Sequence, residues 1–332
     1  MPYLRHFCQL PQNEGAEGGF AAGSIELLHK LQFHLRSFIV APNGKLCYTK
    51  FKFLWQRCAM YPQNEFYLLR NATHHYMQSH IIREKSGKLL VIDGGTRNDA
   101  RYLLHRLKEL SGEAVPHIAG WFFTHPHCDH MDCFFEVMKE LSDEIQFDAV
   151  YCCFPPVEYF DQEYDDPRVT LNTFLSYLPR FENKLVTLKT GDRISIGSIS
   201  FQVLLTPDTS VTENKGNNAS TVIRLCSEEK TILILGDLGM EGGQRLLDAH
   251  GADLKSDLCQ VSHHGQRGCG REVYAAIAPT GCIWTAPDWL WDKQKQEFDF
   301  THNKIEVEWR WMQELGVKNH YVAHSGDVCI PF

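Results

Sequence analysis

Apolar residues recur at alternate positions, or in short unbroken runs, through much of the chain beyond residue 73, and this is the pattern of β-strands. The runs at 76–84 and 88–92 flank a short turn and predict a pair of adjacent strands. Further strands are predicted at 194–196, 200–205, 220–225, 231–235, 258–262 and 282–285. A last hairpin is predicted from 320–322 and 328–330, around the turn at 324–327.

Other segments have the spacing of helices that bury one face. Helices are predicted at 98–110, 132–141 and 305–315. The segment 151–181 is aromatic, acidic and broken by prolines, so we expect it to be irregular, either as a loop over a functional site or as a packed connector. Two strand-rich halves, each with helices, predict an α/β (α+β) architecture in which two sheets pack face to face under helices on both outer faces.

The first 65 residues have a different pattern. Glycines punctuate 1–33, where 24–31 is predicted to form a short helix. The β-rich runs 34–40 and 45–53 flank Pro-Asn-Gly, which has turn chemistry, and they predict a β-hairpin. We therefore divide the chain into an N-terminal extension, 1–65, and a main domain, 66–332.

The composition excludes few classes of protein. Of 332 residues, 43% are hydrophobic and 22% charged, which is ordinary for a globular protein. The net charge of −8 does not favour a nucleic-acid or membrane-surface binder, although a local basic groove stays open. No apolar run approaches the roughly 18 residues of a membrane helix. Twelve cysteines without a Cys-x-x-Cys pair, and no leader, predict a cytoplasmic protein with free thiols.

Candidate chemistry is concentrated in the segment 121–130, Trp-Phe-Phe-Thr-His-Pro-His-Cys-Asp-His. Four metal-capable side chains follow an apolar run within six residues: His125, His127, Asp129 and His130. Imidazole nitrogens and carboxylate oxygens are good zinc ligands. A tight loop after a strand can direct the first two at one ion and the last two at a neighbouring ion. The alternatives are a solvated histidine-rich loop or a single structural zinc.

This motif resembles that of the metallo-β-lactamase superfamily of binuclear metallohydrolases. His127, where some members have Glu, resembles the hydrolase branch and not the di-iron, oxygen-reducing branch. Three further segments resemble the branch of DNA-uptake competence proteins and phosphorylcholine esterases: Asn217-Asn218-Ala219-Ser220, Gly236-Asp237 and His263-His264-Gly265. The resemblance covers roughly 66–332 and implies a metallo-β-lactamase-like hydrolase domain, folded as a four-layer αββα sandwich.

The resemblance also implies the remaining ligands. Asp237 would bridge the two ions, and one histidine of the His-His-Gly segment would complete the second. Because adjacent side chains usually diverge, we expect only one to coordinate, and choose His263 over His264. Many members supply a further histidine to the first ion, where this chain has Thr-Pro-Asp. Asp208 is the candidate substitute, and otherwise the first ion is shared through Asp237 or held more weakly.

The same resemblance implies roles in catalysis. A metal-bound hydroxide would be the nucleophile, and Asp129 would orient it and accept its proton. His324 and Asn218 would donate hydrogen bonds to the developing oxyanion. Asp93, at the end of a predicted strand, would orient the ligand loop.

The predicted function is a binuclear hydrolase with two Zn²⁺ sites, the first weaker, or with Mn²⁺. A small-molecule phosphodiester or related ester is the favoured substrate, and Trp284, Trp289 and Trp291 could form an aromatic wall for a base or a cation. The alternatives are a catalytically inactive metal-binding regulatory or scaffold protein and a nuclease-like hydrolase. The sequence does not specify the leaving group, since β-lactam, thioester and lactone hydrolysis use the same core. It does not specify the oligomeric state either.

Overall fold

The computed structural model describes residues 61–162, 166–293, 305–324 and 326–332. These residues belong to one compact unit, Cys58–Phe332. The helix predicted at 24–31 and the hairpin predicted at 34–53 lie outside the described residues, and the boundary between 65 and 66 stays a prediction. None of the described helices combines the length and the apolar character needed to cross a membrane.

The first of two sheets contains the ligand motif at the end of one of its strands. Its strands are β1 (Glu65–Leu68), β2 (Ser79–Arg83), β3 (Leu89–Asp93), β4 (His117–Phe122), β5 (Gln146–Phe147), β6 (Val150–Cys152), β7 (Leu185–Thr187) and β15 (Val328–Pro331). The order is β15-β1-β2-β3-β4-β6-β7, and β5 pairs with β4. The pairs from β15 to β3 are antiparallel, whereas β3, β4, β6 and β7 run parallel.

The second sheet has the same division into antiparallel and parallel strands. Its strands are β8 (Arg193–Ile196), β9 (Ile199–Leu205), β10 (Val222–Cys226), β11 (Thr231–Ile234), β12 (Leu258–Gln260), β13 (Gly281–Trp284) and β14 (Asn319–Val322). The order is β14-β13-β12-β11-β10-β9-β8. The pairs from β8 to β11 are antiparallel, and those from β11 to β14 are parallel.

The sheets pack through one apolar layer. Phe122 of β4 stacks on Phe201 of β9, with ring centroids 4.3 Å apart, and alternate residues of the other strands fill the space around them. Ile82 faces this layer, whereas its neighbour Ile81 faces the helices on the opposite side of the sheet. This alternation is the expected consequence of the two-residue period of a strand.

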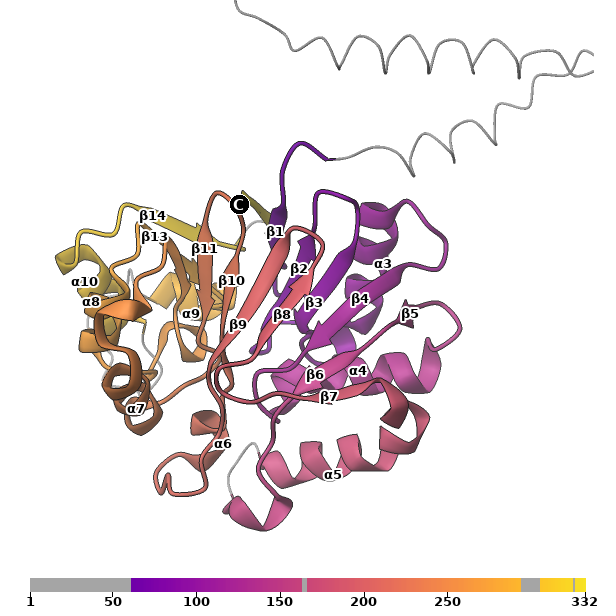
Figure 1. Ribbon diagram of the computed structural model, residues 1–332, viewed down its shortest axis with the longest axis horizontal. Coiled ribbons are helices and arrows are strands. Elements are labelled where there is room, and N and C mark those ends of the chain that lie inside the picture. Colours follow the sequence, from indigo (N-terminus) through magenta and orange to yellow (C-terminus); the bar gives the residue numbers. More distant parts are fainter. Residues whose placement is uncertain (1–60, 163–165, 294–304, 325) are drawn as a thin grey trace, which may run out of the picture. The chain divides into compact units, whose positions relative to one another are not determined.

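Helices cover both outer faces, as Figure 1 shows. The first sheet is covered by α3 (Ala100–Ser111), α4 (Cys128–Glu140) and α5 (Pro167–Tyr177). The second is covered by α7 (Met240–His250), α8 (Arg271–Ile277), α9 (Asp288–Lys293) and α10 (Glu306–Glu314), and the short α6 (Lys215–Asn218) precedes β10. The predicted αββα sandwich is therefore confirmed.

The predicted last hairpin is wrong. β14 pairs with β13 in the second sheet, whereas β15 pairs with β1 in the first, so the chain crosses between the sheets at this point. Asp327 fixes the crossing, because its carboxylate accepts hydrogen bonds from the Tyr102 hydroxyl (2.6 Å) and the Arg70 amide (2.9 Å). Both partners belong to the first half of the chain, which the local pattern could not reveal.

The segment 151–181 is more regular than predicted. Pro167 occupies the first turn of α5, and Asp166 caps that helix by accepting a hydrogen bond from the Arg168 amide (3.0 Å). Leu171 and Phe174 are buried against the first sheet's outer core. The prolines of this segment predicted irregular structure, but Pro167 marks the start of a helix instead. Helices α7 and α8 were not predicted at all.

Candidate metal centre

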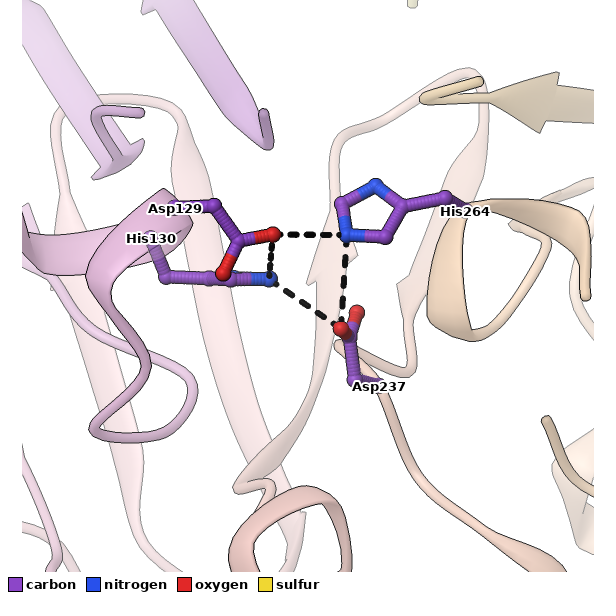
Figure 2. A group of neighbouring side chains, drawn as sticks. All are labelled: Asp129, His130, Asp237 and His264. Carbon is purple, nitrogen blue, oxygen red and sulfur yellow. Dashed lines mark hydrogen bonds and ion pairs between the residues drawn. The ribbon is translucent and has the colours of Figure 1, made fainter. Parts of the chain in front are cut away.

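The candidate ligands lie at the carboxyl ends of parallel strands, where α/β proteins commonly bind ligands. The segment 124–130, a short loop and the first turn of α4, follows β4, Asp237 follows β11, and His263 and His264 follow β12. Because β4 belongs to one sheet and β11 and β12 to the other, the site forms between the ends of the two sheets. Figure 2 shows four of these side chains, Asp129, His130, Asp237 and His264, converging from both sides.

Asp93, at the end of β3, fixes the loop after β4. One carboxylate oxygen accepts a hydrogen bond from the Thr124 amide (2.8 Å), and the other accepts from His130 Nδ1 and from the Gln78 amide nitrogen, both at 2.9 Å. With Nδ1 held in this way, His130 directs Nε2 into the site. The predicted orienting contact of Asp93 is therefore present.

Asp237 is positioned by a glycine and a serine. Gly236 has φ +58°, and a Cβ there would lie 2.8 Å from the Ser220 hydroxyl oxygen, so a larger residue would clash. The same hydroxyl accepts a hydrogen bond from the Asp237 amide (3.0 Å). Ser220 is the last residue of the Asn-Asn-x-Ser segment, so this segment fixes the main chain that carries the Asp237 carboxylate.

The loop after β12 has an unusual backbone. His263 and His264 both have positive φ, +52° and +56°, which is uncommon for residues other than glycine. The His263 amide donates to the Gly236 carbonyl (3.1 Å) and so ties this loop to the end of β11. Strained backbone of this kind is often found at functional sites.

Four side chains form the larger group of candidate ligands: Asp129, His130, Asp237 and His264. Their donor atoms lie within 4.8 Å of one another. His264 Nε2 is 3.0 Å from Asp129 Oδ2 and 3.4 Å from Asp237 Oδ2, and His130 Nε2 is 3.3 Å from the same Asp237 oxygen. Figure 2 shows the four facing a common centre. We call them the four-residue group.

A second group shares Asp237 and adds His125 and His127. His125 Nε2 lies 3.8 Å from Asp237 Oδ2 and 3.0 Å from His127 Nδ1. All three side chains are buried. We call them the three-residue group. Asp237 therefore belongs to both groups, and its role as a bridge between two ions stays a prediction.

Burial and charge act in opposite directions on the histidines of the four-residue group. Burial disfavours the cation of His130, but the carboxylates of Asp237, Asp129 and Asp93 outweigh it and raise the pKa of His130 well above its usual value. In the same way, Asp237 and Asp129 overcome burial and raise the pKa of His264 to about 9. The carboxylates of this group therefore favour positive charge at its centre, which a bound cation would also supply.

The three-residue group is different. Burial, with the unfavourable interaction of a His125 cation with the imidazoles of His130 and His127, holds the pKa of His125 well below its usual value. Burial also lowers the pKa of His127 to about 4, despite the attraction of Asp129 and Asp237. These imidazoles are therefore neutral near pH 7, which is the form that binds metal ions.

Both groups fit a divalent cation. His127 Nε2 and Asp237 Oδ1 are buried and have no hydrogen-bond partner among the described residues. Buried polar atoms are normally paired, so atoms left over in a converging set indicate a missing partner. The imidazole and carboxylate donors suit Zn²⁺ and also leave Mn²⁺ open.

Two of the predicted ligands lie elsewhere. His264, and not His263, belongs to the four-residue group, because the left-handed turn directs the second imidazole of the pair at Asp129. Asp208 forms an ion pair with Arg245 (2.6 Å), its side chain is 43% exposed, and it belongs to neither group. The three-residue group is thus not completed by Asp208.

The predicted oxyanion donors are also displaced. Asn218 has a structural role, since its amide oxygen accepts from the amides of Gly239 and Gly242 at the start of α7 and its nitrogen donates to the Glu213 carbonyl. His324 is an exposed residue that lies 3.1 Å from Asp292. Neither arrangement presents a donor to the four-residue group.

The predicted aromatic wall is largely part of the core. Trp284 is fully buried in the outer layer of the second sheet, where it packs against Trp291 and Trp309. Trp289 differs, because its ring packs on Tyr76 (5.2 Å between centroids), and Tyr76 packs on His264 (5.1 Å). An aromatic pair therefore borders the site, but only one tryptophan contributes to it.

Some contributors were missed. Gln78 supports Asp93, and a lone glutamine gives no recognisable pattern in a sequence. Asn217 was part of the quoted Asn-Asn-x-Ser segment, but its neighbour was chosen, because sequence letters do not show which of two adjacent amides faces the site. The same ambiguity applies to His263 and His264.

Comparisons with known proteins identify the family of the chain. The family profile of the Metallo-beta-lactamase superfamily matches residues 78–300. ComE operon protein 3 of Bacillus subtilis (strain 168) is 31% identical over 100 residues, which is 30% of this chain but only 12% of that protein. Among solved structures, YhfI from Bacillus subtilis covers 80% of this chain and 99% of its own at 10% identity and a TM-score of 0.47. Unliganded yeast PDE1 covers 81% and 99% at 11% identity and a TM-score of 0.49. Because the family profile spans most of the chain and the histidine motif lies within it, the chain belongs to the metallo-β-lactamase superfamily.

Proposed function

We propose that the chain is a metal-dependent hydrolase that holds two divalent ions and cleaves a phosphodiester or a related ester. One observation carries the proposal. The four-residue and three-residue groups meet at a single oxygen of Asp237, so two ions bound to them would be neighbours.

Two neighbouring divalent cations would lower the pKa of a water molecule and neutralise charge on the attacking and leaving oxygens of a displacement. The chain's own residues would set the geometry. Asp129 is the most exposed member of the four-residue group, with 14% of its side chain accessible. It is therefore the carboxylate best placed to orient the attacking water and to accept its proton.

The ionised state of this carboxylate supports that role. Burial would raise the pKa of Asp129, but His130 and His264 outweigh burial and lower it below its usual value. Asp129 is thus a carboxylate at neutral pH. With water as the nucleophile, its oxygen would form a bond to phosphorus, the bond to the leaving oxygen would break, and the leaving oxygen would take up a proton.

A phosphodiester is favoured over a β-lactam on charge. Two closely spaced cations suit an anionic group that presents two oxygens, and a β-lactam carbonyl presents one. Tyr76 and Trp289 border His264 and offer an apolar face for a base or an organic cation of the substrate. The partial match to ComE operon protein 3 does not identify a substrate, because it spans so little of that protein.

Metal analysis and a paired assay test the proposal. Dialysed protein is expected to contain between one and two ions, with the four-residue group holding the tighter one. The metal-loaded protein is then assayed on bis-(p-nitrophenyl) phosphate and on nitrocefin. Faster turnover of the phosphodiester is expected, whereas faster turnover of nitrocefin would reject the substrate choice.

The same assay distinguishes the regulatory alternative. The three-residue group contains fewer ligands than the four-residue group, which is the observation that favours a binding role without catalysis. Protein that retains its metal and hydrolyses neither compound would support that alternative. Protein that is active after chelation, with no metal, would exclude a metal-dependent mechanism altogether.

A further inference from the structure

Asn217 and His263 stand beside the candidate metal centre without belonging to either group of ligands. Asn217 Oδ1 and His263 Nδ1 are both buried and have no hydrogen-bond partner among the described residues. The Asn217 side chain is almost completely enclosed, with 7% exposure. Buried polar atoms of this kind indicate that a ligand completes their hydrogen bonds.

The two side chains contact each other. Asn217 Nδ2 lies 3.5 Å from His263 Nε2, although the residues come from α6 and from the loop after β12. The backbone at His263 is left-handed, with φ +52°. It places this imidazole beside the four-residue group, to which His264 belongs, and not within that group. Two distant segments of the chain therefore converge on one point.

That point is next to the candidate metal centre. The His263 imidazole interacts electrostatically with Asp237 and with Asp129, and it also acts on His127. Its ring centroid is 6.1 Å from that of His264. The pair therefore lies beside the candidate metal centre.

The chemistry of the pair fits an oxygen-rich anion. One N–H of the Asn217 carboxamide is directed at His263 Nε2, so its second N–H and the imidazole Nδ1–H are the two donors of the pair, whereas Asn217 Oδ1 can only accept. Preorganised donors beside a charged centre stabilise an anionic oxygen because they need not reorganise when the ligand binds. A phosphoryl group coordinated near Asp237 would present non-bridging oxygens to such donors.

We propose that Asn217 and His263 form a substrate subsite that holds a non-bridging oxygen of a phosphoryl group. The proposal rests on the proposed phosphodiesterase function for its substrate class. It assigns to Asn217 and His263 the contacts that sequence analysis gave to Asn218 and His324. Asn217 and His263 would bind the substrate, and neither residue would be a ligand of the ions.

The experiment compares Asn217→Ala, His263→Gln and the double variant with the wild type. His117→Gln is the matched control, because His117 is an exposed histidine at the opposite end of β4, where it pairs with Asp148 (2.8 Å). Three quantities are measured on the full chain: metal content after dialysis, the dissociation constant of inorganic phosphate by calorimetry on metal-loaded protein, and kcat and KM on bis-(p-nitrophenyl) phosphate.

We expect the metal content of all variants to equal that of the wild type. Each subsite variant should bind phosphate at least about tenfold more weakly and lose about 10²-fold in kcat/KM, as for removal of one oxyanion donor. The double variant should lose less than the product of the two single losses, because the side chains contact each other. The control should match the wild type.

Three results would overturn the subsite. Loss of an ion in His263→Gln would show that His263 is a metal ligand. Wild-type affinity for phosphate in both single variants would show that neither side chain contacts the anion. A wild-type protein that does not bind phosphate would exclude a phosphoryl subsite. Failure of the proposed function has a different signature. In that case the wild type binds phosphate but does not cleave the phosphodiester, and phosphate binding by the variants still decides the subsite.

Discussion

The loops after β4 and after β12 carry candidate ligands from opposite sheets, and each rests on a buried carboxylate. Under the first loop, both oxygens of Asp93 accept hydrogen bonds, from Thr124, His130 and Gln78. Under the second, the buried carboxyl group of Glu308 in α10 lies near the main-chain amides of Arg267 and Gly268, which favour its charged form.

The two supports differ in how completely they are paired. Glu308 is 3% exposed, and its Oε2 atom has no hydrogen-bond partner among the described residues. Burial raises the pKa of Glu308 to about 7, although the amides of the loop oppose this. A fully satisfied polar network rigidifies its surroundings, whereas a partly satisfied one costs stability. The first loop should therefore be held by its carboxylate, and the second only in part.

The largest effect is expected where the two loops meet. Asp237→Ala removes the oxygen that both groups share, so we expect loss of bound metal and fall of turnover to the level of the blank. Asp208→Ala, which removes an exposed aspartate paired with Arg245, serves as the control and should retain both ions. Metal analysis of the dialysed variants checks this. Metal loss in Asp208→Ala would restore that residue as a ligand.

Asp129→Asn should abolish most turnover while preserving the fold. The amide cannot accept a proton as the carboxylate can, and we expect kcat to fall by about 10²- to 10⁴-fold. Circular dichroism and the thermal midpoint serve as checks on folding. Rates close to those of the wild type on any confirmed substrate would remove Asp129 from its proposed role.

Asp93→Asn tests the first support directly. Asparagine tolerates the left-handed backbone at this position (φ +57°), so the change alters charge and hydrogen bonding without strain. Loss of the contact to His130 should weaken metal affinity by about 10- to 100-fold. Competition with a chelator measures it, and Glu308→Gln should show a smaller loss. An equal loss in both variants would contradict the difference between the two supports.

Much of the fold was predictable because it depends on local pattern. The strands β2 and β3, and the helices α3 and α4, follow from apolar spacing. The errors arose where tertiary contacts decide the outcome. Asp327 ties the turn before β15 to the first sheet, and the glycine pair at 242–243 hides α7 from a propensity argument.

The candidate site shows the same division. The spacing of His125, His127, Asp129 and His130 predicted their convergence, and all four belong to the two groups. To decide between His263 and His264 required the φ values of the turn, which depend on contacts with the end of β11. A sequence identifies a pair of adjacent histidines but not the direction of each.

The smallest effect on turnover, and the clearest on stability, is expected for Glu308→Gln. The pKa of Glu308 rises from 4.5 in the unfolded reference to about 7 in the folded protein, so the folded state binds the proton more tightly. The stability that the protonated carboxyl contributes is fully present below pH 4.5 and is lost as the pH rises to about 7. The shift corresponds to a change on the order of 3 kcal/mol in the free energy of unfolding. Glutamine is neutral throughout and should lack this dependence. Denaturant unfolding at pH 4.5 and 7.5, with a chelator present, measures the free energy of unfolding of the variant and of the wild type. The contributions of the other titrating groups cancel in the difference between the two proteins. A difference that is the same at both pH values would show that the carboxylate of Glu308 is already satisfied, and the two loops would then be supported equally.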